Sequence, residues 1–173
     1  MRSRGQTSGL DLVVAFMLVV FILVSVWEVW TSAITKLGLF QDKRTLDDRL
    51  LDVSELLVKT PGDPQNWHDM GEVNPDTVRS IGFALKDNVL DPAKMQRAST
   101  LEYESLRAIL GLSKEDVYIT IKDLESGNKT PLYAMGRPPE GGRSTLSRYA
   151  VLNGSMAEVS VSLYYANETY MTV

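Results

Sequence analysis

A long apolar segment near the N-terminus constrains this chain more than any other feature. From Leu12 to Trp27 every residue is apolar except Ser25. A helix from Leu10 to Trp27 would be roughly 27 Å long, close to the hydrocarbon thickness of a bilayer. A helix in the core of a soluble protein is the alternative, but this segment keeps no polar stripe to face water. The sequence therefore predicts a membrane-spanning helix, which we place at residues 6–33.

The apolar segment by itself allows three membrane interpretations: a cleaved secretory signal, an uncleaved anchor, or a prepilin-type leader followed by its hydrophobic helix. A secretory signal ends in small residues at its cleavage site. Thr31-Ser32-Ala33 could serve as that site, although Trp27, Glu28 and Trp30 just before it are bulky or charged.

The residues ahead of the apolar segment favour the third interpretation. Arg2 and Arg4 precede Gly5, and the small polar stretch Gln6-Thr7-Ser8-Gly9 follows. This order resembles the class III signal peptides of archaeal pilins and archaellins. Their prepilin-type peptidase cuts on the cytoplasmic side, after a glycine that follows basic residues. The resemblance covers only the N-terminal segment through Trp30 and implies a leader, residues 1–5, that is removed between Gly5 and Gln6.

One acidic residue departs from the family pattern. Type IV pilins and many archaeal relatives carry a glutamate at the fifth mature position, which is thought to pair with the free amine of a neighbouring subunit. Here the fifth mature residue would be Leu10, and Asp11 would be the sixth. Asp11 would meet such an amine from a face about 100° away, or else lie in the headgroup zone. The departure favours a minor or accessory subunit.

Composition limits the rest of the chain. With 173 residues, 44% of them hydrophobic, and a net charge of −4, the chain suits one membrane segment and one modest domain. The acidic balance argues against nucleic acid as a partner. The absence of cysteine excludes disulfides, thiolate nucleophiles and cysteine-ligated metals.

Charge also predicts the orientation. Arg2 and Arg4 place the N-terminus in the cytoplasm, so that everything after about residue 31 would lie outside the membrane. Three N-glycosylation acceptors, Asn128, Asn153 and Asn167, fit that placement.

Residues 34–60 read as an amphipathic helix. Five apolar residues lie at helical spacing while charged residues fill the other face: Leu46, Leu50, Val53, Leu57 and Val58. Thr45 with Asp48 could cap a separate start, although the helix could also continue from the membrane. Pro61-Gly62 ends it. In pilins the first half of the N-terminal helix is typically apolar, and its amphipathic second half packs against a globular head.

Residues 61–173 predict an extracytoplasmic α+β head. A turn-rich loop at 61–77 contains Trp67, which we expect to fold onto the head. A short strand at 78–85 and a helix from Asp91-Pro92, broken near Ser99-Thr100 and ended by Gly111, precede an antiparallel C-terminal sheet. The expected strands of that sheet are 117–124, 131–135, 147–152 and 157–164. Asn153-Gly154 predicts a type I′ turn between the last two.

The sequence offers little for catalysis. His68 is the only histidine, and Asp63, His68 and Asp69 could form a partial metal site, but such residues in one proline-rich loop are more often plain turn chemistry, so no metal is expected. No glycine-rich phosphate loop is present. The C-terminal tyrosines could form a contact face or could be ordinary sheet residues: Tyr149, Tyr164, Tyr165 and Tyr170. We therefore expect no enzyme activity and no cofactor.

These observations lead to one main hypothesis. The chain is expected to be a pilin-like subunit whose partners are the membrane, a prepilin-type peptidase and like or related subunits bound through the N-terminal helix. The alternative is an uncleaved, single-span surface protein whose external domain binds a ligand. A third hypothesis is a secreted domain cut near Ala33.

Overall fold

One long helix, α1 (Arg4–Lys59), forms the N-terminal third of the chain. The structure is a computed structural model and describes residues 4–125 and 130–165, without the side chains of residues 4–8 and 36–42. The chain divides into two compact units, Met1–Arg44 and Thr45–Val173. We call the second the globular unit. The architecture is α+β, as the sequence predicts.

The part of α1 inside the globular unit supplies one side of the core. The five apolar residues expected on one face are all at most 5% exposed: Leu46, Leu50, Val53, Leu57 and Val58. Asp47, Asp48 and Asp52 on the other face are exposed. The amphipathic prediction is confirmed. The suggested separate start at Thr45 is wrong, because α1 passes through this position without a break.

The C-terminal end of α1 is capped by distant backbone. Phe83 N–H donates to the carbonyl of Leu57 at 2.8 Å, and Ala84 N–H donates to that of Thr60 at 3.1 Å. Asn88 N–H donates to the carbonyl of Val58 at 3.2 Å. The last carbonyls of a helix have no partner within it, so these donors satisfy groups that would otherwise be buried without hydrogen bonds. The helix ends just before Pro61-Gly62, as expected.

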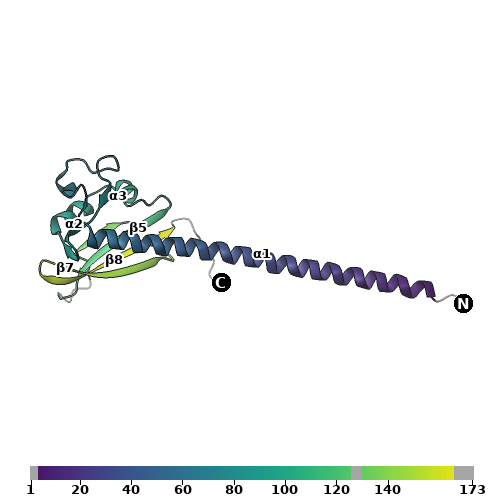
Figure 1. Cartoon of the computed structure of the whole chain (residues 1–173). Helices are drawn as coiled ribbons and strands as arrows, with labels where there is room; N and C mark the ends of the chain where they lie inside the picture. The colour runs from purple at the N-terminus through teal and green to yellow at the C-terminus, as the bar shows by residue number, and fades with distance from the viewer. Residues whose placement is uncertain (1–3, 126–129, 166–173) are drawn as a thin grey trace. The chain divides into compact units, whose positions relative to one another are not determined.

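Within the described residues, six strands form one sheet in the order β3-β4-β7-β8-β5-β6. Their bounds are Ala84–Lys86 (β3), Val89–Leu90 (β4), Glu115–Asp123 (β5), Tyr133–Gly136 (β6), Ser144–Leu152 (β7) and Ser155–Tyr165 (β8). A separate pair joins β1 (Gly62–Asp63) to β2 (Ser80–Ile81). In Figure 1 the last part of α1 runs along this sheet, and the two share one apolar core.

The sheet differs from the prediction in two ways. Strands β5 to β8 are antiparallel as expected, but β4 adds to β7 in parallel, which makes the whole sheet mixed. The single strand expected at 78–85 is wrong, because the chain leaves β2 after Ile81 and re-enters a different sheet at β3. Gly82 makes this break possible: a Cβ there would lie 2.0 Å from the carbonyl oxygen of Thr60.

The hairpin of β7 and β8 follows the sequence closely. Asn153 and Gly154 have φ angles of 52° and 89°, the left-handed values that a type I′ turn requires. Alternate residues of β8 then face the core, from Ala157 to Leu163, and are at most 1% exposed. Both the turn and the alternation confirm the prediction.

Two short helices and a 3-10 turn, η1 (Trp67–Asp69), complete the unit. The Asp91 side chain accepts a hydrogen bond from Ala93 N–H at 3.0 Å and caps α2 (Pro92–Ser99). After a break, α3 (Tyr103–Ile109) follows, and Gly111 ends this region with a φ of +72°. These features and the full burial of Trp67 confirm the sequence-based expectations.

Candidate functional site

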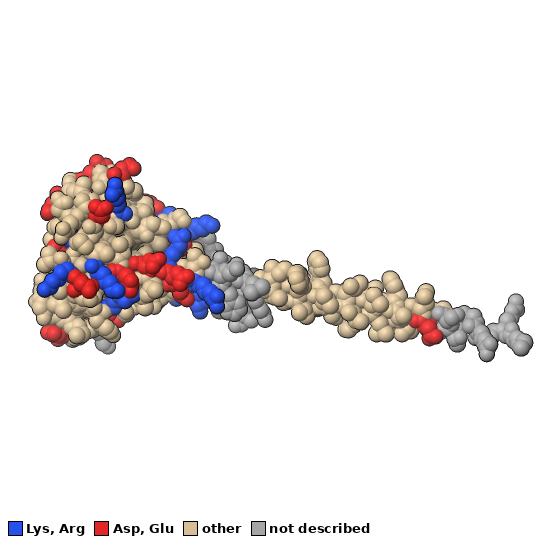
Figure 2. Space-filling view, in the orientation of Figure 1, with Lys and Arg blue, Asp and Glu red and all other residues tan. Residues whose placement is uncertain are grey.

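The most conspicuous surface of the chain is the apolar part of α1. Gly9–Thr35, which we call the apolar span, has 27 residues and is long and apolar enough to cross a membrane, with no residue of its most apolar window buried. Large side chains such as Phe16, Phe21 and Trp27 are between 67% and 70% exposed. In the space-filling view this part of the helix shows almost no charge on the visible face (Figure 2). Such a surface is stable only against lipid or against other apolar side chains.

Three hydroxyl side chains within the apolar span bond to the preceding turn of the helix. Ser25 Oγ donates to the carbonyl of Phe21 at 2.9 Å, and Thr31 Oγ1 donates to that of Trp27 at 3.0 Å. Thr35 Oγ1 repeats the pattern one turn later, with the carbonyl of Thr31 at 2.9 Å. Hydroxyls bonded to the preceding turn need no partner from their surroundings, so these residues do not spoil an apolar environment.

The residues of the predicted processing site lie at the start of α1. Arg4 is its first residue and Gly5 and Gln6 follow, while Arg2 lies outside the described residues. The bond expected to be cut is therefore in the first helical turn, where backbone N–H groups have no partner within the helix. Asp11 is exposed on the same helix.

One of the three predicted glycosylation acceptors lies among the described residues. Asn153 is exposed in the tight turn between β7 and β8, on the globular unit. Asn128 and Asn167 lie outside the described residues.

The predicted tyrosine face is not continuous, since Tyr149 is 63% exposed whereas Tyr164 is 6% exposed and donates to the carbonyl of Arg137. Tyr170 also lies outside the described residues.

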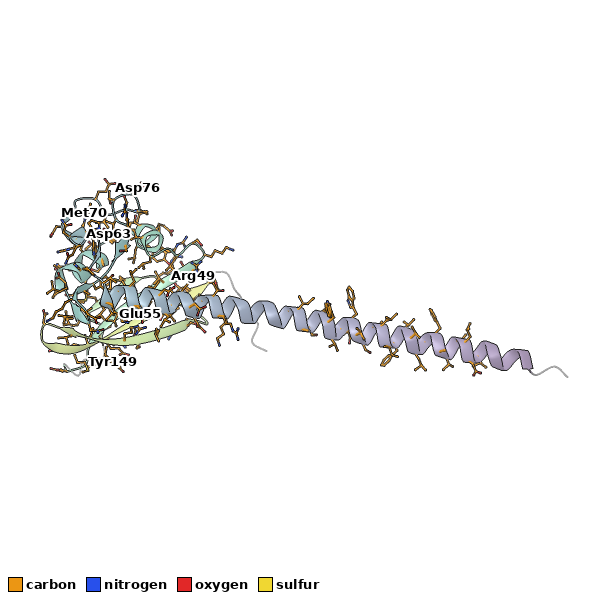
Figure 3. All side chains as sticks on the ribbon, in the orientation of Figure 1. Arg49, Glu55, Asp63, Met70, Asp76 and Tyr149 are labelled. Carbon is orange, nitrogen blue, oxygen red and sulfur yellow. The ribbon has the colours of Figure 1, made fainter. Side chains whose placement is uncertain are left out.

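Two arginines connect the globular part of α1 to the sheet. Arg148 of β7 donates to Ser54 Oγ at 2.9 Å and pairs with Glu55 Oε1 at 3.1 Å. Arg49 pairs with the buried carboxylate of Glu115 on β5 at 3.4 Å. Lys59 and, less strongly, Arg148 hold the pKa of Glu55 below its ordinary value. Figure 3 shows Arg49 and Glu55 on the part of α1 that lies along the sheet.

A second polar cluster surrounds the buried carboxylate of Asp116. It accepts a hydrogen bond from the Tyr103 hydroxyl and lies 3.5 Å from Arg107 and 3.9 Å from Arg137. The Arg137 guanidinium also lies 5.0 Å from the centre of the Tyr103 ring. Burial, followed by the hydrogen bond to Asp116, raises the pKa of Tyr103 to about 12. The cluster fastens α3 to β5 and leaves Asp116 fully paired, so we assign it a structural role.

The suggested partial metal site does not form. Asp63 Oδ2 lies 3.6 Å from Arg79 Nη1, and His68 Nε2 lies 3.6 Å from Asp69 Oδ1. Across the described parts of the chain, no three His, Asp or Glu side chains gather as metal ligands would. Asp63 and Asp69 are both exposed, beside Arg79 and the His68 ring respectively.

Sequence reasoning missed the contacts around Arg148, Glu115 and Asp116. The Arg148 and Glu115 pairs join segments far apart in the chain, the Asp116 contacts join α3 to the strand that follows it, and no local motif marks any of them. Comparisons with protein-family models, curated proteins and solved structures find no match to this chain.

Proposed function

We propose that this chain is a pilin-like subunit, minor or accessory, of an archaeal type IV pilus-like surface filament. The observation that supports the proposal best is the difference in exposure between the two parts of α1. The apolar span exposes its side chains to the surroundings, whereas Leu46 to Val58 are built into the core of the globular unit. A subunit needs both properties in one helix, because the apolar part must bind neighbours or lipid while the other part holds the external domain.

In this proposal the apolar span has two successive environments. It first anchors the chain in the bilayer, with Arg2 and Arg4 in the cytoplasm. After removal of residues 1–5 it packs against the corresponding helices of like or related subunits. Both environments are apolar, so the same largely apolar surface suits each of them.

The alternative function is an uncleaved membrane-anchored surface protein with a ligand-binding external domain. It uses the same apolar span, but the span stays in the bilayer. The two functions differ at the N-terminus, because only the filament subunit requires cleavage between Gly5 and Gln6.

The deciding experiment is the determination of the N-terminus of the full chain purified from its native membrane, by intact mass and terminal peptides. We expect the mature chain to begin at Gln6, and a Gly5→Asp variant to retain its leader. Gly9→Ala is the matched control, because it changes a nearby glycine outside the expected cleavage motif and should leave processing intact.

The other outcomes are equally informative. A chain that keeps Met1 or Arg2 would contradict the filament proposal and support the membrane anchor. A chain that begins near Ile34 would contradict both and indicate a secreted domain. If the N-terminus is Gln6, electron microscopy of sheared surface material with an antibody against the globular unit tests incorporation into filaments.

A further inference from the structure

An open pocket of about 330 Å³, lined by both polar and apolar groups, lies on the globular unit. Three separate segments line it: the loop and 3-10 turn around Trp67, strand β3, and the start of α2. Its lining residues are Gln65, Asn66, His68, Leu85, Asp91 and Lys94. Its volume lies at the lower end of the range of small-molecule sites, about 300–1,000 Å³, and its wide opening leaves part of any ligand in contact with water.

The most unusual lining residue is Lys94, whose side chain is almost completely buried. The residue is 2% exposed. Its ammonium donates to the carbonyl oxygens of Pro61 at 2.8 Å and Ala84 at 3.1 Å. Burial lowers the pKa of Lys94, and the nearby Asp91 only partly opposes this effect. An ammonium has three hydrogens to donate, so one donor remains after these two bonds.

The charge of Lys94 has no directly bound counter-ion. Both of its hydrogen-bond partners are neutral carbonyls, and Asp91 acts on its charge only electrostatically. A buried charge is costly unless it is paired, and a carboxylate against an ammonium forms one of the stronger hydrogen bonds in proteins. The site would therefore gain more from an anionic group than from a neutral one.

The remaining lining groups indicate what else such a ligand should carry. One carboxylate oxygen of Asp91 accepts the capping bond from Ala93 N–H, which leaves the other to accept from a hydroxyl. The amides of Gln65 and Asn66 are exposed and can both donate and accept. Leu85, which is 61% exposed, offers an apolar wall for carbon-bound hydrogens.

We propose that this pocket binds a small hydroxy-carboxylate of the acidic-sugar class, with the ligand carboxylate near Lys94 and a ligand hydroxyl at Asp91. A neutral sugar would give Lys94 no carboxylate to hydrogen-bond, only the more distant field of Asp91, and a simple carboxylate would leave Asp91 and the amides unused. The site lies wholly within the globular unit and does not depend on processing or filament assembly. It would serve a filament subunit and a membrane anchor equally.

The test is isothermal titration calorimetry on the full chain in detergent micelles, with D-glucuronate and D-galacturonate as probes and D-glucose and D-galactose as their neutral counterparts. We expect saturable binding of at least one acidic sugar, with an affinity about tenfold or more above that of its neutral counterpart. Equal affinity for the acidic and neutral sugars, or no binding of either acidic sugar, would overturn the proposal.

Variants of the pocket identify the binding site. Gln65→Ala and Asn66→Ala change exposed side chains, so both should fold normally and weaken binding by about three- to tenfold. Lys94→Met should abolish binding. Because Lys94→Met removes the bonds to Pro61 and Ala84 and could impair folding, the two amide variants keep the test decisive.

The matched control is Lys86→Met, on the exposed end of β3 and outside the pocket lining, which should bind normally. Undiminished binding by both amide variants would place the ligand elsewhere and contradict the proposal.

Discussion

Two parts of α1 contain many apolar residues, yet only one of them forms a core. In the apolar span the side chains point in every direction around the helix and remain exposed. Between Leu46 and Val58 the apolar residues form one stripe, and they are almost completely buried. The difference lies in the arrangement of apolar residues rather than in their presence.

This comparison shows what a small sheet can and cannot cover. A sheet packs against one side of a helix, so a stripe of apolar residues can be buried while the charged face remains in water. A helix that is apolar on all sides needs partners on all sides, which only lipid or a bundle of other helices provides. Four predictions test this difference, in order of decreasing effect.

The largest effect is expected from truncation of a core residue in the second part of α1. Leu57 is fully buried, so Leu57→Ala should lower the free energy of unfolding of the globular unit by about 2–5 kcal/mol. The measurement is denaturant unfolding of the full chain in micelles, followed by Trp67 fluorescence in a background that carries Trp27→Phe and Trp30→Phe.

The matched control makes the same change in the first part of α1. Leu23 is 63% exposed, and Leu23→Ala should leave the free energy of unfolding unchanged. Equal destabilisation by the two variants would mean that the apolar span contributes to the core of the globular unit.

The second prediction concerns membrane insertion of the apolar span instead of folding of the globular unit. A lysine at the centre of a spanning helix costs about 2.5–3.5 kcal/mol, so Val20→Lys should make the apparent free energy of insertion less favourable by about that amount. The ratio of glycosylated reporter forms in microsomes measures it. Leu51→Lys adds the same charge to an exposed position of the globular part of α1 and should leave insertion unchanged. An equal loss for both variants would show that the apolar span does not insert by itself.

The third prediction concerns the end of α1. A methyl group on Gly82 would approach the carbonyl oxygen of Thr60 to 2.0 Å, where backbone atoms leave no room. Gly82→Ala should therefore destabilise the globular unit by about 3 kcal/mol in the same unfolding experiment. Gly71 has no atom within 4 Å of an added Cβ, so Gly71→Ala is the control and should change stability by less than about 0.5 kcal/mol. A stable Gly82→Ala variant would contradict the close approach of Gly82 to Thr60 at the helix end.

The smallest effect is a pH dependence that only the globular unit should show. The folded chain raises the pKa of Tyr103 from its ordinary 10.0 to about 12, so the folded state holds this proton more tightly than the unfolded state. The resulting stability is complete below pH 10 and is lost as the pH rises toward 12. The effect should be modest, because Tyr103 is only partly buried.

Removal of the hydroxyl tests this assignment. Tyr103→Phe should reduce the fall in the free energy of unfolding between pH 10 and pH 12, measured by denaturant titration at a series of pH values, and Tyr164, whose pKa burial also raises, should account for part of the remainder. Tyr149→Phe, at an exposed position, should leave the slope as it is in the unchanged chain. An unaltered slope in Tyr103→Phe would show that another group causes the alkaline loss.

The sequence predicts most of the local structure because the responsible signals are local. The apolar span, the helix end before Pro61-Gly62, the Asp91 cap of α2 and the Asn153-Gly154 turn each depend on a few adjacent residues. The helical stripe of α1 is equally readable, because its period is visible within a single segment. The processing site between Gly5 and Gln6 stays a prediction from the same local kind of signal.

Only the tertiary structure determines the long-range contacts. The parallel pairing of β4 with β7 brings together Val89 and Val151, and two-residue strands carry too little pattern to predict a partner. The break at Gly82 follows from the proximity of Thr60, which the residues around Gly82 do not reveal. The pocket around Lys94 is a further case, since its three lining segments meet only after the sheet has formed. Periodicity and turn chemistry act between neighbours in the chain, whereas pairing, close approach and burial of charge depend on which distant segments meet.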